Sequence, residues 1–313
     1  MIERRERGPY KGCGLAPVTC GELLQGEIGG RDFLVTCPLE LYSRAVVYLE
    51  LEGPKTPLAD ADDGLYPVEV VSGQEPGAVK KAALAVRKAA ALCGARPRRA
   101  WLDLRCPVPA GKGMGSSTAD IVAAARATAR ALGRELTPRQ LAGIALSIEP
   151  SDGVMYPGIA LFDHRRGKTA RVLGEAPPAK LLVFDYGGEV DTLAFNRLPS
   201  LSALNRAKEK EIALALKKVC RGLQKGELHL VGEGATRSAL AHQSILPKPD
   251  LEEIVQAVLK MGAAGIVCAH SGTVIGVLFV RESRQSKECE RYLSRLGFGE
   301  ILGEFPLGWA RTR

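Results

Sequence analysis

The chain has 313 residues and a formal net charge of +8, with 46% hydrophobic and 25% charged residues. This composition is typical of a soluble globular protein and excludes disordered and fibrous proteins, and the length favours about two domains. No run of about 18 apolar residues is present, so the sequence predicts no membrane span. The charged N-terminus is not followed by a hydrophobic stretch, which argues against a secretion signal. We therefore expect a cytoplasmic protein.

Eight cysteines are scattered along the chain without a Cys-x-x-Cys pair, which excludes the usual zinc and redox spacings. We expect most of them to be buried as small hydrophobic side chains. The excess of basic residues is compatible with binding either nucleic acid or small anions. Because only 5% of the residues are aromatic, a surface for single-stranded nucleic acid is not indicated.

The N-terminal part is rich in strand-forming residues and turns. Residues 34–35 and 45–49 are predicted strands, Gly29-Gly30 is a predicted hairpin turn, and residues 53–67 are a predicted loop. Apolar residues at three- and four-residue steps predict a helix over 76–94. The alternating segment 101–106 is a predicted strand, and a second helix is expected over 116–132, ended by Gly133.

Thr137 and Pro138 indicate the start of a third helix, which should end near Glu149 because a proline follows. Beyond Gly158, strands and helices are mixed without regular β-α-β alternation, so the sequence favours an α+β fold. We expect a domain boundary near residue 177, which gives domains 1–176 and 177–313. The later predicted strands are 159–162, 180–185, 265–269 and 274–280, and the later predicted helices are 203–224, 228–240, 250–261 and 284–296.

Three glycines at alternate positions, Gly111, Gly113 and Gly115, directly precede the predicted helix that begins at Ser116. Unshielded loop amides and the unpaired amides of a helix N-terminus together form an anion site, and a phosphate chain is its natural ligand. The P-loop pattern fails because Gly113 follows Lys112, and the dinucleotide fingerprint fails because Ser116 stands where it needs a glycine. The alternative is a turn that only caps the helix.

The segment Pro109-x-x-x-Gly113-Met114-Gly115-Ser116-Ser117-Thr118-Ala119 resembles the phosphate-binding motif of the GHMP kinases. Residues 16–27 resemble the N-terminal motif of this family, and residues 264–276 resemble its C-terminal glycine motif. All three occur in the family's order and spacing. Within the family, residues 19–26, 37–43 and 148–153 resemble most the L-threonine kinases of cobalamin biosynthesis.

This resemblance implies a two-domain fold, with an N-terminal domain like the ribosomal protein S5 domain 2 and a ferredoxin-like C-terminal domain. It implies phosphorylation of L-threonine by ATP with Mg²⁺, to O-phospho-L-threonine for the aminopropanol linker of cobalamin. Homoserine or another small alcohol is an alternative acceptor. An RNA-binding protein on the S5-like fold is an alternative of another class, motivated by the pI of about 9.1. The expected partners are small molecules, without nucleic acid or membrane, and the expected state is a monomer or homodimer.

The resemblance also implies roles for individual residues. A serine of the pair Ser116 and Ser117, together with Glu149, would hold the metal ion. Glu149 is the only acid at the end of an apolar helix, and burying it without a cation would be costly, although a solvated glutamate is the alternative. The residues expected to bind the nucleotide are Pro109, Gly111, Lys112, Gly113, Met114, Gly115, Ser116, Ser117 and Thr118.

Asp152 is expected near the acceptor hydroxyl, as a base or an orienting group. The alternative is that Asp152 only stabilises a turn. Ser116 and Glu149 are the other two expected catalytic residues. Glu22 and Gln25 could pair with the ammonium and carboxylate of a zwitterionic acceptor, and an exposed glutamate is equally compatible with the sequence. Ser271 and Gly272, next to His270, are either part of the substrate site or a plain turn. His164, His229 and His242 show no ligand-like spacing and receive no role.

Overall fold

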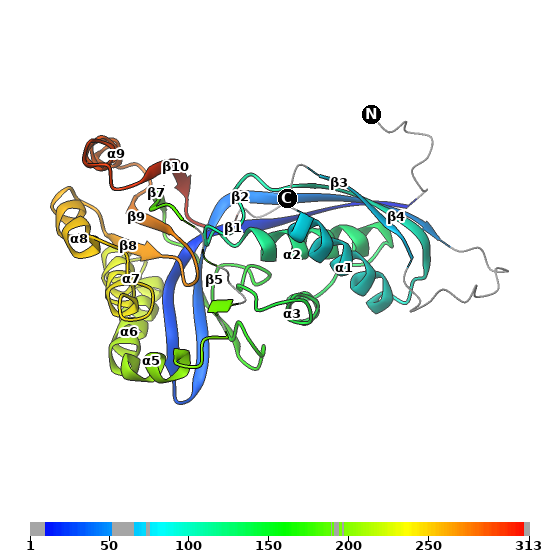
Figure 1. Ribbon diagram of the computed structural model, residues 1–313, viewed down its shortest axis with the longest axis horizontal. Helices are drawn as coiled ribbons and strands as arrows, with labels where there is room; N and C mark the ends of the chain where they lie inside the picture. Colours follow the sequence, from blue (N-terminus) through cyan, green and yellow to red (C-terminus); the bar gives the residue numbers. More distant parts are fainter. Residues whose placement is uncertain are drawn as a thin grey trace. The chain divides into compact units, whose positions relative to one another are not determined.

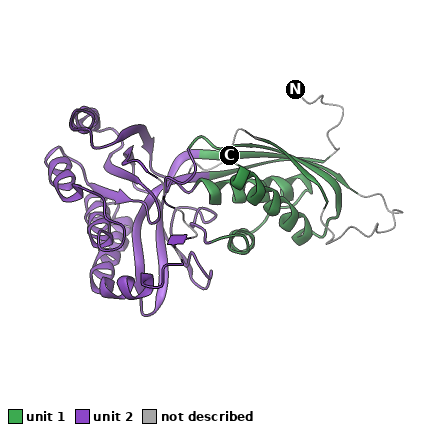
Figure 2. Ribbon diagram, viewed as in Figure 1, with its two compact units in different colours: residues 1–16, 42–108, 116–149 green, residues 17–41, 109–115, 150–313 purple. Residues whose placement is uncertain are grey.

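The computed structural model describes residues 10–51, 66–72, 76–188, 190, 194–195 and 197–309 (Figure 1). The chain divides into two compact units (Figure 2). Unit 1 comprises residues 1–16, 42–108 and 116–149, and unit 2 comprises residues 17–41, 109–115 and 150–313. The glycine loop 109–115 therefore belongs to unit 2, whereas Ser116 and Glu149 belong to unit 1. The division into 1–176 and 177–313 stays a prediction, and most of the predicted loop 53–67 lies outside the described residues.

Two long strands, β1 (Tyr10–Ile28) and β2 (Arg31–Leu51), are joined by the predicted turn at Gly29 and Gly30. Both glycines have positive φ, +59° and +73°, as a tight hairpin turn with this twist requires. The strands are much longer than predicted. Residues 16–27 of β1 are all buried, so the alternation of apolar and polar residues that marks a strand is lost there.

In unit 1, β2 pairs antiparallel with β4 (Pro97–Arg105), and β3 (Val68–Ser72), which was not predicted, pairs parallel with β4. The helices are α1 (Pro76–Leu92), α2 (Ser116–Ala131) and α3 (Pro138–Leu146). A Cβ at Gly12 would lie 2.0 Å from the carbonyl oxygen of Ala127, so β1 and α2 approach closely where the strand has no side chain.

Helix α3 begins as predicted. The Thr137 side chain accepts from the Gln140 amide, and the Gln140 side chain accepts from the Thr137 amide, which completes a capping box. The helix ends at Leu146, three residues earlier than expected, but the amide of Glu149 still donates to the carbonyl oxygen of Ala145 at 3.0 Å. This contact holds Glu149 close to the end of the helix.

In unit 2 the strands lie in the order β10-β7-β9-β8-β1-β2, with β5 paired to β2 and β6 paired to β5. The pairings of these later strands are antiparallel. The bounds are β5 (Ile159–Phe162), β6 (Ala170–Gly174), β7 (Ala179–Asp185), β8 (Gly265–Cys268), β9 (Val274–Val280) and β10 (Glu300–Pro306). Strands β6 and β10 were not predicted, and the other four agree with the sequence to within one or two residues at each end.

The helices of unit 2 are α5 (Leu201–Ala207), α6 (Glu209–Lys225), α7 (Leu228–His242), α8 (Leu251–Lys260) and α9 (Gln285–Leu296). The prediction of one helix over 203–224 is wrong, because the chain breaks at Lys208, where φ is −96° and ψ is 5°. No helix within the described ranges combines the length and the apolar character needed to cross a membrane.

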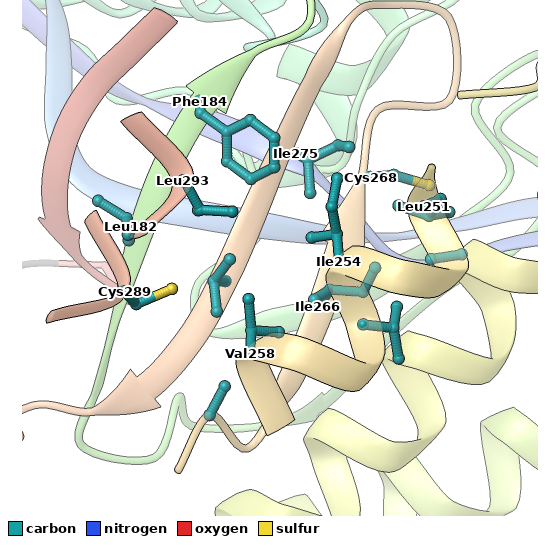
Figure 3. Packing of buried hydrophobic residues seen from close by; sticks show 14 of the residues in the cluster. Leu182, Phe184, Leu251, Ile254, Val258, Ile266, Cys268, Ile275, Cys289 and Leu293 are labelled. Atoms are coloured by element: carbon teal, nitrogen blue, oxygen red, sulfur yellow. The ribbon is translucent and has the colours of Figure 1, made fainter. Parts of the chain in front are cut away.

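A buried apolar cluster joins the sheet of unit 2 to α8 and α9 (Figure 3). Phe184, Ile266 and Ile275 come from β7, β8 and β9, and they pack with Ile254 of α8 and Leu293 of α9. Each fully buried side chain of this size contributes about 1.5–3 kcal/mol relative to an exposed one. This core fixes the end of β8, where Cys268 leads into the turn with His270, Ser271 and Gly272.

Candidate active site

The glycine loop has the backbone conformation that its sequence predicts. Gly111, Gly113 and Gly115 have φ values of +76°, +84° and +62°, which residues with a side chain rarely adopt. Met114 between them is only 1% exposed, so its side chain anchors the loop in the protein. Pro109, at the start of the loop, is exposed.

Loop carbonyl groups accept hydrogen bonds from two neighbouring segments of unit 2. The carbonyl of Lys112 accepts from the amides of Thr273 and Val274, at 2.9 and 3.1 Å. The carbonyl of Met114 accepts from the amide of Thr19 at 2.8 Å, and that of Gly113 accepts from Gly21 at 3.2 Å. The segment around Thr19 and the turn before Val274, both singled out in the sequence, therefore hold the glycine loop.

The turn that contains Ser271 and Gly272 lies directly against the loop. A Cβ at Gly272 would lie 2.4 Å from Cα of Gly113 and 2.5 Å from the carbonyl oxygen of Lys112. Gly272 is therefore required by close backbone approach and serves more than a turn between strands. Ser271 is half-buried beside it.

Although carbonyl groups of the loop accept hydrogen bonds, three amides at the end of the loop remain able to donate to a ligand. Among the described residues, the amides of Gly113, Gly115 and Ser116 donate to no acceptor. Helix α2 begins at Ser116 and has no acidic residue in its first turn. Unpaired amides beside a positive helix terminus suit a phosphate group, so the residues present fit a nucleotide phosphate chain.

Lys112 is held by an ion pair. Its Nζ lies 2.9 Å from Oδ2 of Asp185 and donates to the carbonyl of Gly188 at 2.8 Å. Against the effect of burial, hydrogen bonds that include the one from Lys112 lower the pKa of Asp185. The ammonium group is thus fixed at the end of β7 and is not simply solvated.

In unit 1, Glu149 is buried with a cation beside it. Its side chain accepts a hydrogen bond from Ser117 Oγ, and Nζ of Lys81 lies 2.7 Å from Oε2. Nζ of Lys81 also lies 3.3 Å from Ser117 Oγ. Glu149 is 7% exposed, so the alternative of a solvated glutamate is wrong.

The sequence interpretation missed Lys81. A signal existed, because Lys81 precedes the buried residues Ala85 and Ala89 by four and eight positions, which puts it on the buried side of α1. The adjacent Lys80 is exposed. The position of each lysine relative to the apolar face of α1 therefore distinguishes Lys81 from Lys80.

The Ser117 hydroxyl and the Glu149 carboxylate supply the hard oxygen ligands that Mg²⁺ prefers. Within the described ranges no group of three or more His, Cys, Asp and Glu side chains could hold a metal. Two protein oxygens fit a magnesium ion that takes its other ligands from nucleotide phosphates and water. Of the two candidate serines, Ser117 is the one that contacts Glu149. Thr118, one residue further on, is buried in α2.

The buried Glu22 and the half-buried Asp152 form an acidic pair in unit 2. Burial, and next the charge of Asp152, raise the pKa of Glu22 well above its ordinary value of 4.5. Glu22 is 4% exposed, so the alternative of an exposed glutamate is wrong. A Cβ at Gly115 would lie 2.8 Å from Oδ2 of Asp152, so this carboxylate lies against the glycine loop.

Gln25 is fully buried and its side chain makes specific contacts. Its Nε2 lies 3.3 Å from the carbonyl oxygen of Cys268, and its Oε1 lies 2.9 Å from Nδ1 of His270. The ring of His270 lies 5.5 Å, centroid to centroid, from that of His242, with 33° between the ring planes. The sequence interpretation gave His242 no role, because residues 28 positions apart carry no local signal of their proximity.

Comparison with known proteins identifies the class. The GHMP kinases N terminal domain matches residues 78–160, and the GHMP kinases C terminal domain matches residues 212–297. The chain is 33% identical over 265 residues to an L-threonine kinase of Citrobacter freundii, with 85% of each chain covered. It is 32% identical over 286 residues to an L-threonine kinase of Salmonella typhimurium, with 89% of this chain and 88% of the relative covered.

A solved structure supports the fold. Homoserine kinase from Cytophaga hutchinsonii aligns with a TM-score of 0.65 at 16% identity, over 91% of this chain and 90% of that one. These matches define a small-molecule kinase with the mixed α and β fold expected from the sequence. The chain belongs to the GHMP kinase family, and it therefore transfers a phosphoryl group to an alcohol. Membership in a kinase family decides against the RNA-binding alternative.

Proposed function

We propose that the protein is an ATP-dependent kinase that converts L-threonine to O-phospho-L-threonine. The observation that carries the proposal is the 33% and 32% identity to two L-threonine kinases over most of the chain. Homoserine is the weaker alternative, because the likeness to a homoserine kinase is 16% identity and concerns the fold. We also propose Mg²⁺ as the metal that accompanies ATP, a cytoplasmic location, and use of the product in cobalamin synthesis.

Phosphate binding in this proposal rests on the backbone. The amides of Gly113, Gly115 and Ser116 donate to the phosphate oxygens of ATP, and Ser117 and Glu149 hold the magnesium ion. When bound, the magnesium ion neutralises charge on the phosphates during transfer. Lys81 lies beside the buried carboxylate of Glu149 and holds it in position.

Acceptor activation rests on Asp152. The threonine hydroxyl oxygen forms a bond to the γ-phosphorus, and the bond from that phosphorus to the bridging oxygen of ADP breaks. The hydroxyl proton goes to Asp152 if this residue acts as the base, or to solvent if it only orients the hydroxyl. Glu22, next to Asp152, faces the ammonium group of the acceptor, whose positive charge opposes the rise in the pKa of Glu22 that burial and Asp152 cause.

The experiment that tests the proposal measures ADP formation with ATP and MgCl₂ across L-threonine, L-serine, L-homoserine and mevalonate, with the product identified by ³¹P NMR. We expect the highest kcat/KM with L-threonine. A higher kcat/KM with homoserine or mevalonate, or ADP release with none of the four, would contradict the proposal. Asp152→Asn should lower kcat at least about tenfold while KM for ATP is kept.

A further inference from the structure

Four basic side chains are buried together in unit 2, beside His164, whose ring centroid lies 5.2 Å from that of His270, and the kinase chemistry described above uses none of the four. They are Lys208, Lys248, His242 and His270, with exposed fractions of 6%, 4%, 1% and 6%. They come from the break between α5 and α6, the loop before α8, the end of α7 and the turn after β8. We refer to these four residues as the basic cluster.

Hydrogen bonds connect three members of the cluster to Gln25. Nζ of Lys208 lies 3.1 Å from Nδ1 of His242, and Nε2 of His242 lies 2.9 Å from the carbonyl oxygen of His270. Since an ammonium group only donates and a carbonyl only accepts, His242 is neutral, with its proton on Nε2. Gln25 Oε1 accepts from Nδ1 of His270, and Nε2 of His270 has no partner among the described residues.

The cluster holds positive charge that the protein does not neutralise. Nζ of Lys248 is buried and has no hydrogen-bond partner, and neither lysine of the cluster forms a salt bridge with a described residue. Burial lowers the pKa of Lys208 to about 8. Burial, and next the charge of Lys208 for His242 and of His164 for His270, holds the pKa values of both histidines well below their ordinary range; Lys248 acts in the same direction on both. A dehydrated, unpaired ammonium group is strongly unfavourable, so the site is complete only with an anion.

The backbone of Lys248 is held in place by the side chain of Gln243. The side chain of Gln243 accepts from the amide of Lys248 at 2.8 Å and donates to its carbonyl at 2.7 Å. Pro247 and Pro249 flank the lysine and restrict the backbone further. The buried ammonium group is therefore presented by a rigid loop, which is the arrangement expected of a binding residue.

The basic cluster and the acidic pair meet at the same strand end. Gln25 contacts both Cys268 and His270, and Glu22 faces Cys268 in the pairing of β1 with β8. Cys268 is also the member of the apolar core at this end of β8, beside Leu251 (Figure 3). An amino acid carries one ammonium and one carboxylate group, so it matches a site with carboxylates on one side and ammonium groups on the other.

We propose that Lys208 and Lys248, together with Gln25 and His270, bind the carboxylate group of an amino-acid acceptor. The inference rests on the proposed function for the identity of the acceptor, and it assigns these residues to substrate specificity. An acceptor that is a phosphorylated alcohol would be disfavoured, because it lacks the ammonium group that Glu22 and Asp152 would bind. An acceptor without a carboxylate leaves Lys248 unpaired.

The first test measures melting temperatures without any turnover. Lys248→Met removes the charge and keeps most of the side-chain volume, and Lys210→Met, at an exposed position of α6, is the matched control. We expect K248M without ligand to melt at the same temperature as the wild type or higher, because an unpaired buried charge is lost. L-2-aminobutyrate, which has the carboxylate but no hydroxyl, should raise the melting temperature of the wild type and K210M and leave that of K248M unchanged.

The second test measures kinetics with L-threonine and with L-threoninamide, which lacks the carboxylate charge. We expect K248M to raise KM for L-threonine by about 100-fold, with KM for ATP within about threefold of the wild type. The preference for L-threonine over L-threoninamide should be large in the wild type and in K210M, and should fall below about tenfold in K248M. Lys208→Met should act in the same direction, which keeps the test valid if K248M does not fold.

The outcomes separate this inference from the proposed function. If the wild type phosphorylates L-threonine and both lysine variants keep its KM, the carboxylate site is wrong and the function stands. If the wild type phosphorylates none of the acceptors but L-2-aminobutyrate stabilises it and not K248M, the function is wrong and the site stands. If K248M unfolds and K208M keeps the wild-type response to L-2-aminobutyrate, both lysines are structural and the inference is overturned.

Discussion

The ammonium group of Lys81 lies 2.7 Å from Oε2 of Glu149, so a lysine neutralises the carboxylate that the proposed mechanism assigns to a divalent cation. Lys81→Met removes this positive charge from beside the buried carboxylate. Because the lysine side chain is 32% exposed, we expect the free energy of unfolding to fall by a moderate amount, about 1–3 kcal/mol. Urea denaturation of K81M, with the exposed-site variant Lys80→Met as the control, measures this loss.

The metal should compensate for the lost lysine. Added MgCl₂ and ATP should raise the melting temperature of K81M by more than that of the wild type, since the cation then supplies the missing charge. Equal stability of K81M and the wild type, with equal shifts on adding MgCl₂ and ATP, would show that the ion pair with Glu149 has no energetic role.

Substitution of Ser117 and of its neighbour Ser116 should have very different effects on kcat. Ser117 Oγ donates to Glu149, so Ser117→Ala removes a proposed magnesium ligand and should lower kcat by about 100-fold. Ser116→Ala removes a hydroxyl that does not contact Glu149 and should change kcat by less than about fivefold. Steady-state ADP release measures both variants.

Metal preference gives a sharper test of the same residue. Ser117→Cys replaces a hard oxygen ligand by a softer sulfur, so its activity should recover more with Mn²⁺ or Cd²⁺ than with Mg²⁺. The same metal series on Ser116→Cys is the control. Recovery in S116C and not in S117C would exchange the roles of the two serines.

The glycine loop could be predicted from sequence because its signals are local. Gly113 and Gly115 precede Ser116 within four residues, and their positive φ follows directly from the lack of a side chain. The cap of α3 at Thr137 is local in the same way. By contrast, the pairing of Lys81 with Glu149 joins residues 68 positions apart; the helical pattern places Lys81 on the buried side of α1 but does not indicate which carboxylate it contacts.

The strand errors have a physical cause as well. The middle of β1 is buried on both faces, which removes the alternation that marks a strand, so its length was underestimated. Strand β6 is largely exposed and, among the described strands, pairs with β5 alone, so it lacks the alternation of buried and exposed residues that marks a strand. The break at Lys208 was missed because no glycine or proline marks it, yet this break brings the lysine next to His242.

Glu22 should make stability depend on pH. Its pKa in the folded protein lies well above 4.5, chiefly because of burial and then because of Asp152. As the pH rises from 4.5 toward that raised pKa, the unfolded chain loses the proton while the folded protein keeps it. Stability therefore falls by about 1.4 kcal/mol per pH unit in this window, and is recovered only at lower pH.

Glu22→Gln removes this dependence. The difference in melting temperature between E22Q and the wild type should shift in favour of E22Q from pH 5 to pH 8, with Glu300→Gln, at an exposed position of β10, as the control. A difference that stays constant across this range would mean that Glu22 titrates as an ordinary carboxyl group.

Substitution of Gly272 tests whether the glycine loop must lie against the turn that contains Ser271 and Gly272. A Cβ at this position would lie 2.4 Å from Cα and 2.5 Å from the amide nitrogen of Gly113, and both are backbone atoms that no rotamer change can move. Gly272→Ala must therefore displace the loop or the turn, at a cost of about 1–3 kcal/mol. The displaced loop aims its amides away from the phosphates, so kcat/KM for ATP should fall by about 100-fold or more.

Gly143→Ala is the matched control, because a Cβ there meets nothing within 4 Å and alanine favours the helix it lies in by about 0.5–1 kcal/mol. This variant should keep full activity and melt slightly higher. If G272A retained the wild-type kcat/KM for ATP while its circular dichroism spectrum stayed native, the loop would tolerate displacement. Phosphate binding would then depend on the start of α2 and not on the contact between Gly113 and Gly272.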